Sequence, residues 1–196
     1  MSNTASSAGS KPIVLAYSGG LDTSFLVPWV AENYGRPVIT VTVDTGGIDA
    51  ATARTLGERA RALGAVEHHQ VDARADYFEQ VLRFLIMGNV KRGQLYPLCV
   101  GAERVMQAQT IAHMARKLGT NSIAHGCTAA GNDQVRFEVA LRTLAPELEI
   151  IAPVRDRAFK RQEDLVRLLK KEGHEVTQSS ISRDLRDLGV SKAAGR

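Results

Sequence analysis

The sequence predicts an α/β protein built on a doubly wound parallel sheet of about five strands, followed by a short all-α tail. Three observations predict this arrangement. Apolar segments with strand character alternate with helical segments through residues 11–157, glycines follow several of the helical segments, and the charge balance changes near residue 157. Regular alternation of strands and helices is typical of a parallel sheet with helical crossovers on both faces.

The predicted strands are short segments of nearly continuous apolar character, typical of strands buried on both faces of a sheet. They are Ile13–Tyr17, Val38–Val43, Val66–Val71, Ser122–His125 and Glu149–Pro153. Helical periodicity lies between them, over Thr23–Tyr34, Asp49–Leu63, Ala75–Met87, Ala102–Leu118 and Gln134–Leu144. Gly35, Gly64 and Gly119 directly follow three of these helices, at the position where a left-handed cap favours glycine.

Length and composition predict one globular core with a small appendage. The 196 residues are 44% hydrophobic and 23% charged, which is ordinary for a globular protein. Residues 1–10 are small and polar, so we expect them to be disordered, and they lack the apolar core of a signal peptide. No segment has the length of a membrane span, and Cys99 and Cys127 have no zinc-like spacing, so we expect a reduced, cytoplasmic setting and no membrane partner.

The formal charge of +4 is confined to the tail. Residues 1–154 carry 14 lysines and arginines and 14 acidic residues, whereas residues 155–196 carry 11 against 7. A neutral body with a basic end indicates two parts with different partners.

The segment Ala16–Ser24 follows the first strand and begins the first helix. Gly19 and Gly20 allow the backbone to approach an anion, the first helical amides point toward it, and nearby hydroxyls add donors. The segment has neither the Gly-Lys-Ser/Thr ending of a Walker A loop nor the Gly-x-Gly-x-x-Gly of a dinucleotide site. It therefore predicts a phosphate site of another kind; the alternative is an ordinary turn between strand and helix.

Ligands of open α/β sheets bind outside the carboxyl ends of the strands. The segments that follow the predicted strands are rich in small or acidic residues: Ser18–Asp22, Asp44–Gly47, Asp72–Arg74 and Gly126–Asp133. We expect all of them to lie at one edge of the sheet.

The segment after the fourth predicted strand suits an amino-acid ligand. Asp133 offers a carboxylate for an ammonium group, while Asn132 and Arg136 offer an amide and a guanidinium for a carboxylate or ureido group. In the alternative interpretation, Asp133 only caps the following helix. The residues alone leave both interpretations open.

Taken together, the two motifs resemble those of the argininosuccinate synthase family. Ala16–Ser24 resembles the pyrophosphate loop of N-type ATP pyrophosphatases, and Gly-Asn-Asp-Gln-Val-Arg-Phe-Glu at 131–138 resembles the family's second loop. The resemblance extends from about Lys11 to about Arg157, including the Leu-Tyr-Pro-Leu and Leu-Ala-Pro-Glu runs at 95–98 and 144–147. It implies an adenine nucleotide α-hydrolase-like fold and a ligase of arginine biosynthesis. Such a ligase uses ATP with Mg to join citrulline to aspartate, giving argininosuccinate, AMP and pyrophosphate through a citrullyl-adenylate.

The resemblance also implies roles for individual residues. The implied ATP-binding residues are Ala16, Tyr17, Ser18, Gly19, Gly20, Leu21, Asp22, Thr23, Ser24, Val43 and Gly126. Asp22 would also meet Mg through the phosphates. The implied citrulline-binding residues are Tyr96, Asn132 and Arg136, and the implied aspartate-binding residues are Thr128, Asn132 and Asp133. No protein nucleophile is needed, because positioning and charge neutralisation are the expected catalytic contributions.

The sequence departs from the family pattern in three ways. Gly101 stands near a position usually occupied by a citrulline-contacting serine, and Ala129-Ala130 replaces a common Gly-Lys. Nothing in the chain matches the family's synthetase and oligomerisation region, through which a homo-oligomer would be expected. Activity of this chain on its own is therefore left open.

Residues 158–196 predict two short helices, an amphipathic one over Phe159–Leu169 and a second over Val176–Leu188. The second resembles the recognition helix of the helix-turn-helix in bacterial arginine repressors. That resemblance implies weak duplex DNA binding with Gln178, Ser182 and Arg183 facing the major groove. The chain would then be an arginine-pathway regulator whose α/β body senses nucleotide or citrulline. Two alternatives remain for the tail: a helical hairpin packed on the body, or the start of the synthetase region.

Overall fold

The computed structural model describes residues 11–156, except 94 and 128–131. The chain divides into two compact units, Met1–Asp156 and Arg157–Arg196, and every described residue lies in the first. The predicted disorder of residues 1–10 and the predicted helix-turn-helix of residues 158–196 lie outside the described residues.

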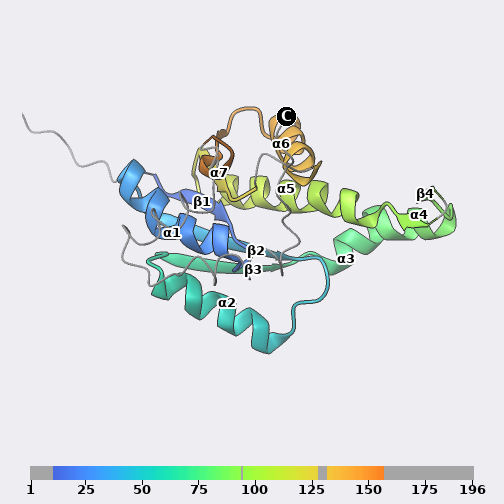
Figure 1. Ribbon diagram of the computed structural model, residues 1–196, viewed down its shortest axis with the longest axis horizontal. Helices are drawn as coiled ribbons and strands as arrows, with labels where there is room; N and C mark the ends of the chain where they lie inside the picture. The colour runs from blue at the N-terminus through green and yellow to red at the C-terminus, as the bar shows by residue number, and fades with distance from the viewer. Residues whose placement is uncertain (1–10, 94, 128–131, 157–196) are drawn as a thin grey trace, which may run out of the picture. The chain divides into compact units, whose positions relative to one another are not determined.

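A five-stranded sheet forms the centre of the first unit (Figure 1). Its strands are β1 (Ile13–Ala16), β2 (Val38–Asp44), β3 (Glu67–Asp72), β6 (Ser122–His125) and β7 (Glu149–Ile151). They pair in parallel in the order β3-β2-β1-β6-β7, which confirms the predicted fold class. The strand order reverses between β1 and β6, so the loops that follow these two strands lie at the switch point where such sheets bind ligands.

Helices cover both faces of the sheet. Successive β1 side chains point to opposite faces, so they pack against different helices. Ile13 and Leu15 pack into one core with α1 (Leu21–Tyr34) and α2 (Ala50–Ala62). Val14 packs into a second core with α5 (Cys99–Lys117) and α6 (Asn132–Leu144). The side chains of Ile13, Val14 and Leu15 are fully buried, as expected for the central strand of a doubly wound sheet.

Several element boundaries differ from the sequence prediction. The last strand ends at Ile151 rather than Pro153, because Pro153 lacks an N–H group and begins α7 (Pro153–Asp156). The single helix predicted over Ala75–Met87 is divided into α3 (Arg74–Tyr77), a π-helical stretch η1 (Phe78–Leu82) and α4 (Arg83–Met87).

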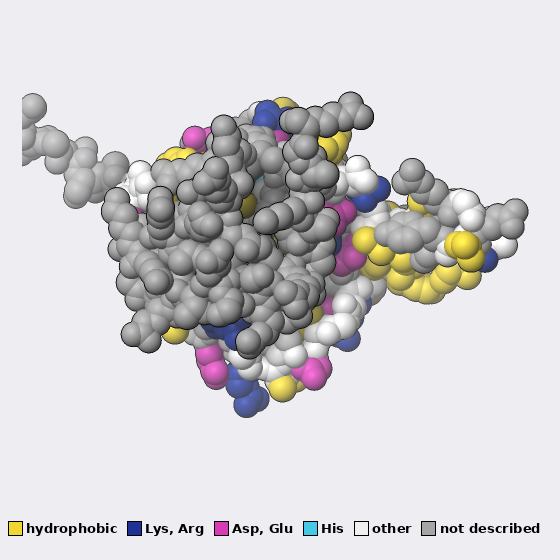
Figure 2. Space-filling view, viewed as in Figure 1, with side chains coloured by type: hydrophobic (Ala, Val, Ile, Leu, Met, Phe, Trp, Pro, Cys, Tyr) yellow, Lys and Arg dark blue, Asp and Glu magenta, His cyan; other side chains and the backbone are white. Residues whose placement is uncertain are grey.

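A two-stranded antiparallel hairpin, β4 (Lys91–Arg92) and β5 (Tyr96–Pro97), was not predicted, because strands of two residues carry no periodicity. The hairpin follows α4, and hydrophobic side chains gather on this part of the molecule (Figure 2). The large exposed hydrophobic residues of η1, α4 and the hairpin include Phe78, Phe84, Ile86, Met87 and Leu95.

Within the described residues, no helix combines the length and the apolar character needed to cross a membrane.

Candidate ligand-binding site at the carboxyl edge of the sheet

The loop between β1 and α1 is held by its own hydroxyl groups. The hydroxyls of Ser18 and Thr23 lie 3.2 Å apart, and the Gly20 amide donates to Ser18 Oγ at 3.4 Å. Thr23 donates to the Gly20 carbonyl at 3.3 Å, and Ser24 donates to the Gly19 carbonyl at 3.4 Å. No side chain caps the N-terminus of α1 at Gly20. This loop therefore presents hydroxyls and unbonded helix amides, the groups that bind phosphate.

Gly19 has a φ of +75°, which favours glycine, and space at this position is occupied. A Cβ atom on Gly19 would lie 2.1 Å from Leu56 Cδ2 of α2. Arg59, one turn further along α2, donates to the Gly19 carbonyl at 3.0 Å. The conformation of the loop thus depends on α2 packed against it.

The loop that follows β6 meets the same helix start. A Cβ atom on Gly126 would lie 3.0 Å from Thr23 Cγ2 and 3.3 Å from Asp22 Cβ, so a larger residue would require these neighbours to shift by a few tenths of an ångström. Burial raises the pKa of the Asp22 carboxyl, because no cation among the described residues compensates its desolvation there. A carboxylate of this kind is suited to a ligand that brings its own cation.

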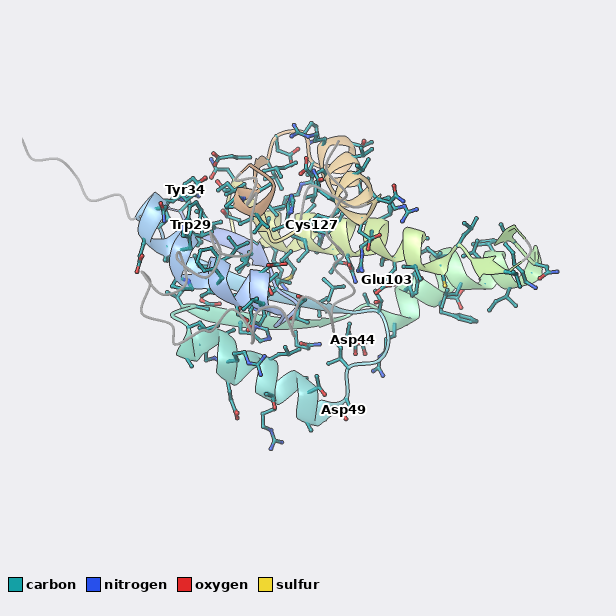
Figure 3. All side chains as sticks on the ribbon, viewed as in Figure 1. Trp29, Tyr34, Asp44, Asp49, Glu103 and Cys127 are labelled. Carbon is teal, nitrogen blue, oxygen red and sulfur yellow. The ribbon has the colours of Figure 1, made fainter. Side chains whose placement is uncertain are left out.

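Val43 and the buried Asp44 end β2 at this edge. Asp44 accepts a hydrogen bond from the Gly46 amide at 2.8 Å, which turns the chain away from the sheet. The next residue, Thr45, donates to Glu103 of α5 at 2.6 Å. Figure 3 shows Asp44 of β2, Glu103 of α5 and Cys127 of the loop that follows β6.

The acidic and basic residues of the second motif form a compact group at the start of α6. Asp133 lies in the first turn of α6, and its carboxylate contacts Arg136 Nη1 at 3.2 Å and Arg104 Nε at 3.3 Å. A Cβ atom on Gly101 would lie 3.3 Å from the Arg136 guanidinium carbon, so glycine leaves room for this side chain over α5. The Asp133 carboxylate is engaged by two cations rather than serving only as a helix cap.

Charges from three helices converge on Cys127. Burial is the main reason that the pKa of the Cys127 thiol is raised. The carboxylates of Asp133, Glu138 and Asp22 raise it further, while Arg104 lowers it. The residues predicted for phosphate and those predicted for amino acids therefore lie within electrostatic range of one point.

A buried His–Glu pair fixes the end of β6. His125 Nδ1 accepts a hydrogen bond from the Cys127 amide at 3.3 Å, so Nε2 carries the proton and faces Glu138 Oε1 at 3.4 Å. Glu138 also accepts from Gln134 at 3.0 Å. These contacts connect the strand end to α6, which carries Asp133 and Arg136.

The predicted site residues are brought together in part. The residues from Ala16 to Ser24, with Gly126, share one end of the sheet with Val43, and Asn132, Asp133 and Arg136 share the start of α6. Tyr96 lies on the hairpin strand β5, shortly before α5. Thr128, Gln178, Ser182 and Arg183 lie outside the described residues, so their predicted roles stay predictions.

Arg104, Glu103 and Gln107 of α5 were not predicted: Arg104 contacts Asp133, Glu103 accepts from Thr45, and Gln107 donates to Glu103. Polar residues on a helix usually belong to a solvated face, so no signal in the sequence distinguished them.

The family described as Arginosuccinate synthase N-terminal HUP domain matches residues 12–173 of the chain. The chain belongs to the argininosuccinate synthase family.

Argininosuccinate synthases from two organisms illustrate the similarity. The enzyme of Pyrobaculum aerophilum is 44% identical over 158 residues, and that of Lactococcus lactis subsp. cremoris is 43% identical over 157 residues. Each alignment covers 80% of this chain and 39% of the relative. The chain therefore spans about two-fifths of the length of these argininosuccinate synthases.

A solved structure supports the fold alone. A predicted subunit of a tRNA methyltransferase from Methanocaldococcus jannaschii has a TM-score of 0.52 at 16% identity, covering 83% of this chain and 88% of that chain.

The match to the argininosuccinate synthase family continues to residue 173. It thus runs beyond residue 157, into the segment for which the sequence also suggested a repressor-like module.

Proposed function

We propose that this chain is the ATP-binding part of an argininosuccinate synthase, an ATP-dependent carbon–nitrogen ligase that joins citrulline to aspartate. The observation that carries the proposal is the close approach of Gly126 to Thr23 and Asp22. In support of the proposal, the chain that leaves β6 toward Asp133 and Arg136 passes close to the phosphate-type loop at Gly126, as expected for a reaction between an amino acid and a nucleotide.

The nucleotide would bind across the switch point of the sheet. Its phosphates would meet the loop hydroxyls and first amides of α1, and its adenosine would lie near Val43 and Gly126. Within residues 11–127 and 132–156, no group of three or more His, Cys, Asp or Glu side chains could hold a metal ion. Asp22 is the residue that would meet Mg through the phosphates, and the ion would supply charge neutralisation there.

The amino-acid substrates would bind through the start of α6 and the neighbouring loops. Tyr96, Asn132 and Arg136 are assigned to citrulline, and Thr128, Asn132 and Asp133 to aspartate. The citrulline ureido oxygen would attack the α-phosphorus of ATP, breaking the bond to the β-phosphate bridge and releasing pyrophosphate. The aspartate amine would then attack the activated ureido carbon and release AMP.

In this scheme the protein contributes position and charge rather than a nucleophile. The first amides of α1 would stabilise the departing pyrophosphate and Arg136 would orient citrulline, while Mg, when bound, would supply additional positive charge. Asp133 would hold the ammonium end of aspartate before its amine reacts. The chain spans about two-fifths of the length of its relatives. That it catalyses the full reaction on its own is therefore part of the proposal.

The test is pyrophosphate release by the purified chain with Mg and ATP, with and without citrulline. Citrulline-dependent release is expected, followed by argininosuccinate and AMP when aspartate is added. The Asp133→Asn variant should keep the first step and lose the second, because the amide has no charge for an ammonium group. Pyrophosphate release that is indifferent to citrulline would contradict the ligase assignment.

A further inference from the structure

Arg104 and Arg136 hold the Asp133 carboxylate from two sides. Arg136 Nη1 contacts Oδ1 at 3.2 Å from the same helix, and Arg104 Nε contacts Oδ2 at 3.3 Å from α5. All three side chains are partly buried, with exposed fractions of 37%, 30% and 46% for Arg136, Arg104 and Asp133. A carboxylate held at both oxygens has little freedom to rotate. The position of Arg104, on a different helix from Asp133, therefore contributes to the orientation of the Asp133 carboxylate.

The contacts of Arg104 continue along α5. Arg104 Nη1 donates to Gln107 Oε1 at 2.7 Å, and Gln107 Nε2 donates to Glu103 Oε1 at 2.9 Å. The same Glu103 oxygen accepts the hydroxyl of Thr45 at 2.6 Å. An unbroken series of polar contacts therefore joins the loop after β2 to the start of α6.

The charges of this group match one of the proposed substrates. Two guanidinium groups and one carboxylate at the start of α6 leave a net charge of +1 on Arg104, Asp133 and Arg136. Free aspartate carries one ammonium and two carboxylates, a net charge of −1. Its ammonium can pair with Asp133, while one of its carboxylates can pair with guanidinium N–H groups that do not contact Asp133.

We propose that Arg104 is a positioning residue: it orients Asp133 toward aspartate and, through Gln107 and Glu103, ties that orientation to the loop after β2. The proposal rests on the proposed function for its ligand, but the contacts that define it exist without ligand.

The first experiment measures aspartate binding to the full chain by calorimetry in the presence of Mg and ATP. Arg104→Gln should weaken aspartate binding by about tenfold, the loss expected for one charge-assisted contact, while ATP affinity changes less than about twofold. Arg104→Lys should restore part of the affinity, since it keeps the charge but not the planar fork. In the Asp133→Asn background, Arg104→Gln should have little further effect, because the two residues act as a unit.

The matched control is Arg116→Gln. Arg116 lies on the same helix, pairs with Glu147 at 2.7 Å and donates to the carbonyl of Leu144, the last residue of α6. This variant removes the same charge from α5 and should leave aspartate affinity unchanged. Equal losses of aspartate affinity in both variants, or equal losses of ATP and aspartate affinity in Arg104→Gln, would overturn the proposal.

A second measurement needs no ligand. Amides of residues 136–141 bond back to the first turns of α6, so hydrogen exchange in this stretch reports how firmly Asp133 is held. Arg104→Gln should accelerate it, whereas Arg116→Gln should not, and exchange in α1 should be unchanged in both. Unchanged exchange in Arg104→Gln would overturn the positioning role, whereas accelerated exchange in a chain that binds no aspartate would refute the proposed function and leave the positioning role standing.

Discussion

The two ends of the sheet are built on different principles. At the amino end, Arg36 donates to the Lys11 carbonyl at 2.7 Å and to Ser122 Oγ at 2.9 Å, and pairs with Glu149 at 3.7 Å. The Thr120 hydroxyl donates to the Pro12 carbonyl at the same end. These contacts join β1, β6 and β7 through groups that belong to the protein itself.

At the carboxyl end, the polar groups lie on the loops that follow the strands and on the helix starts beside them. Gly19 and Gly126 bring backbone close to the start of α1, Asp22 is partly buried with a raised pKa, and Asp133 is shared by two arginines. Under the proposed function, stability and ligand binding depend on opposite ends of the same strands. Variants at the amino end should therefore change stability without changing affinity, whereas variants at the carboxyl end should change affinity.

The largest effect is expected at the phosphate-type loop. Gly19→Ala introduces a Cβ that lies 2.1 Å from Leu56 Cδ2, on a backbone with φ of +75°. We expect ATP affinity to fall by more than about a hundredfold, because both the strain and the shift of the loop oppose phosphate binding. Calorimetric titration with Mg and ATP measures this loss.

Gly35→Ala separates strain from position. Gly35 has a similar φ of +59° but no atom within 4 Å of an added Cβ, and it caps the far end of α1. It should cost about 1 kcal/mol of stability and leave ATP affinity unchanged. If Gly19→Ala bound ATP as well as Gly35→Ala does, the loop would not be the phosphate site.

The amino end should respond in stability alone. Arg36→Met removes the hydrogen bonds to Lys11 and Ser122, and we expect a loss of about 2 kcal/mol in the free energy of unfolding. Denaturant unfolding measures the loss, and ATP titration should show no change. Arg83→Met is the control, since its exposed pair with Glu79 should contribute less than about 1 kcal/mol. A large change of ATP affinity in Arg36→Met would break the distinction between the two ends.

Asp22→Asn should weaken ATP binding while stabilising the ligand-free fold. The raised pKa of Asp22 means that the folded state binds this proton more tightly than the unfolded state. The stabilisation from that proton is present below the ordinary carboxyl pKa and is lost as pH rises through the raised pKa. At neutral pH the asparagine variant should therefore melt higher than the native chain, and the difference should vanish in acid.

The affinity of this variant for Mg and ATP should fall by about tenfold, because a carboxylate near the metal is lost. Thermal melting at several pH values and calorimetry with ATP test the two halves of the prediction. A variant that melts lower at neutral pH would show that Asp22 supports the fold rather than the ligand.

The smallest effect is expected for Gly101→Ser, which restores the residue usual in the family. The added Cβ would lie 3.3 Å from the flexible Arg136 side chain, which can shift by a few tenths of an ångström. Stability should change by less than about 0.5 kcal/mol, and citrulline binding should improve slightly through the new hydroxyl. Weaker citrulline binding would mean that Arg136 needs the space that glycine leaves.

The fold and half of the site could be predicted because their signals are local. Val14 and its neighbours carry continuous apolar character, and the phosphate-type loop combines its glycines and hydroxyls within nine consecutive residues, 16–24. Arg104 could not be predicted, because its partner Asp133 lies on another helix and nothing near Arg104 in sequence differs from an exposed helix face. The π-helical stretch Phe78–Leu82 was missed for a similar reason, since its apolar spacing resembles that of an α-helix.

The packing of α2 under Gly19 has a consequence for how the molecule opens. Leu56 fills the space beneath the loop and Arg59 bonds its carbonyl, so the loop and α2 form one cooperative unit in local unfolding. Any ligand that binds the closed loop raises the free energy of opening for the whole unit by RT ln(1 + [L]/Kd), although α2 lies behind the loop. A protease that cuts α2 is therefore a reporter of nucleotide occupancy, because the cleavage rate falls as the site fills.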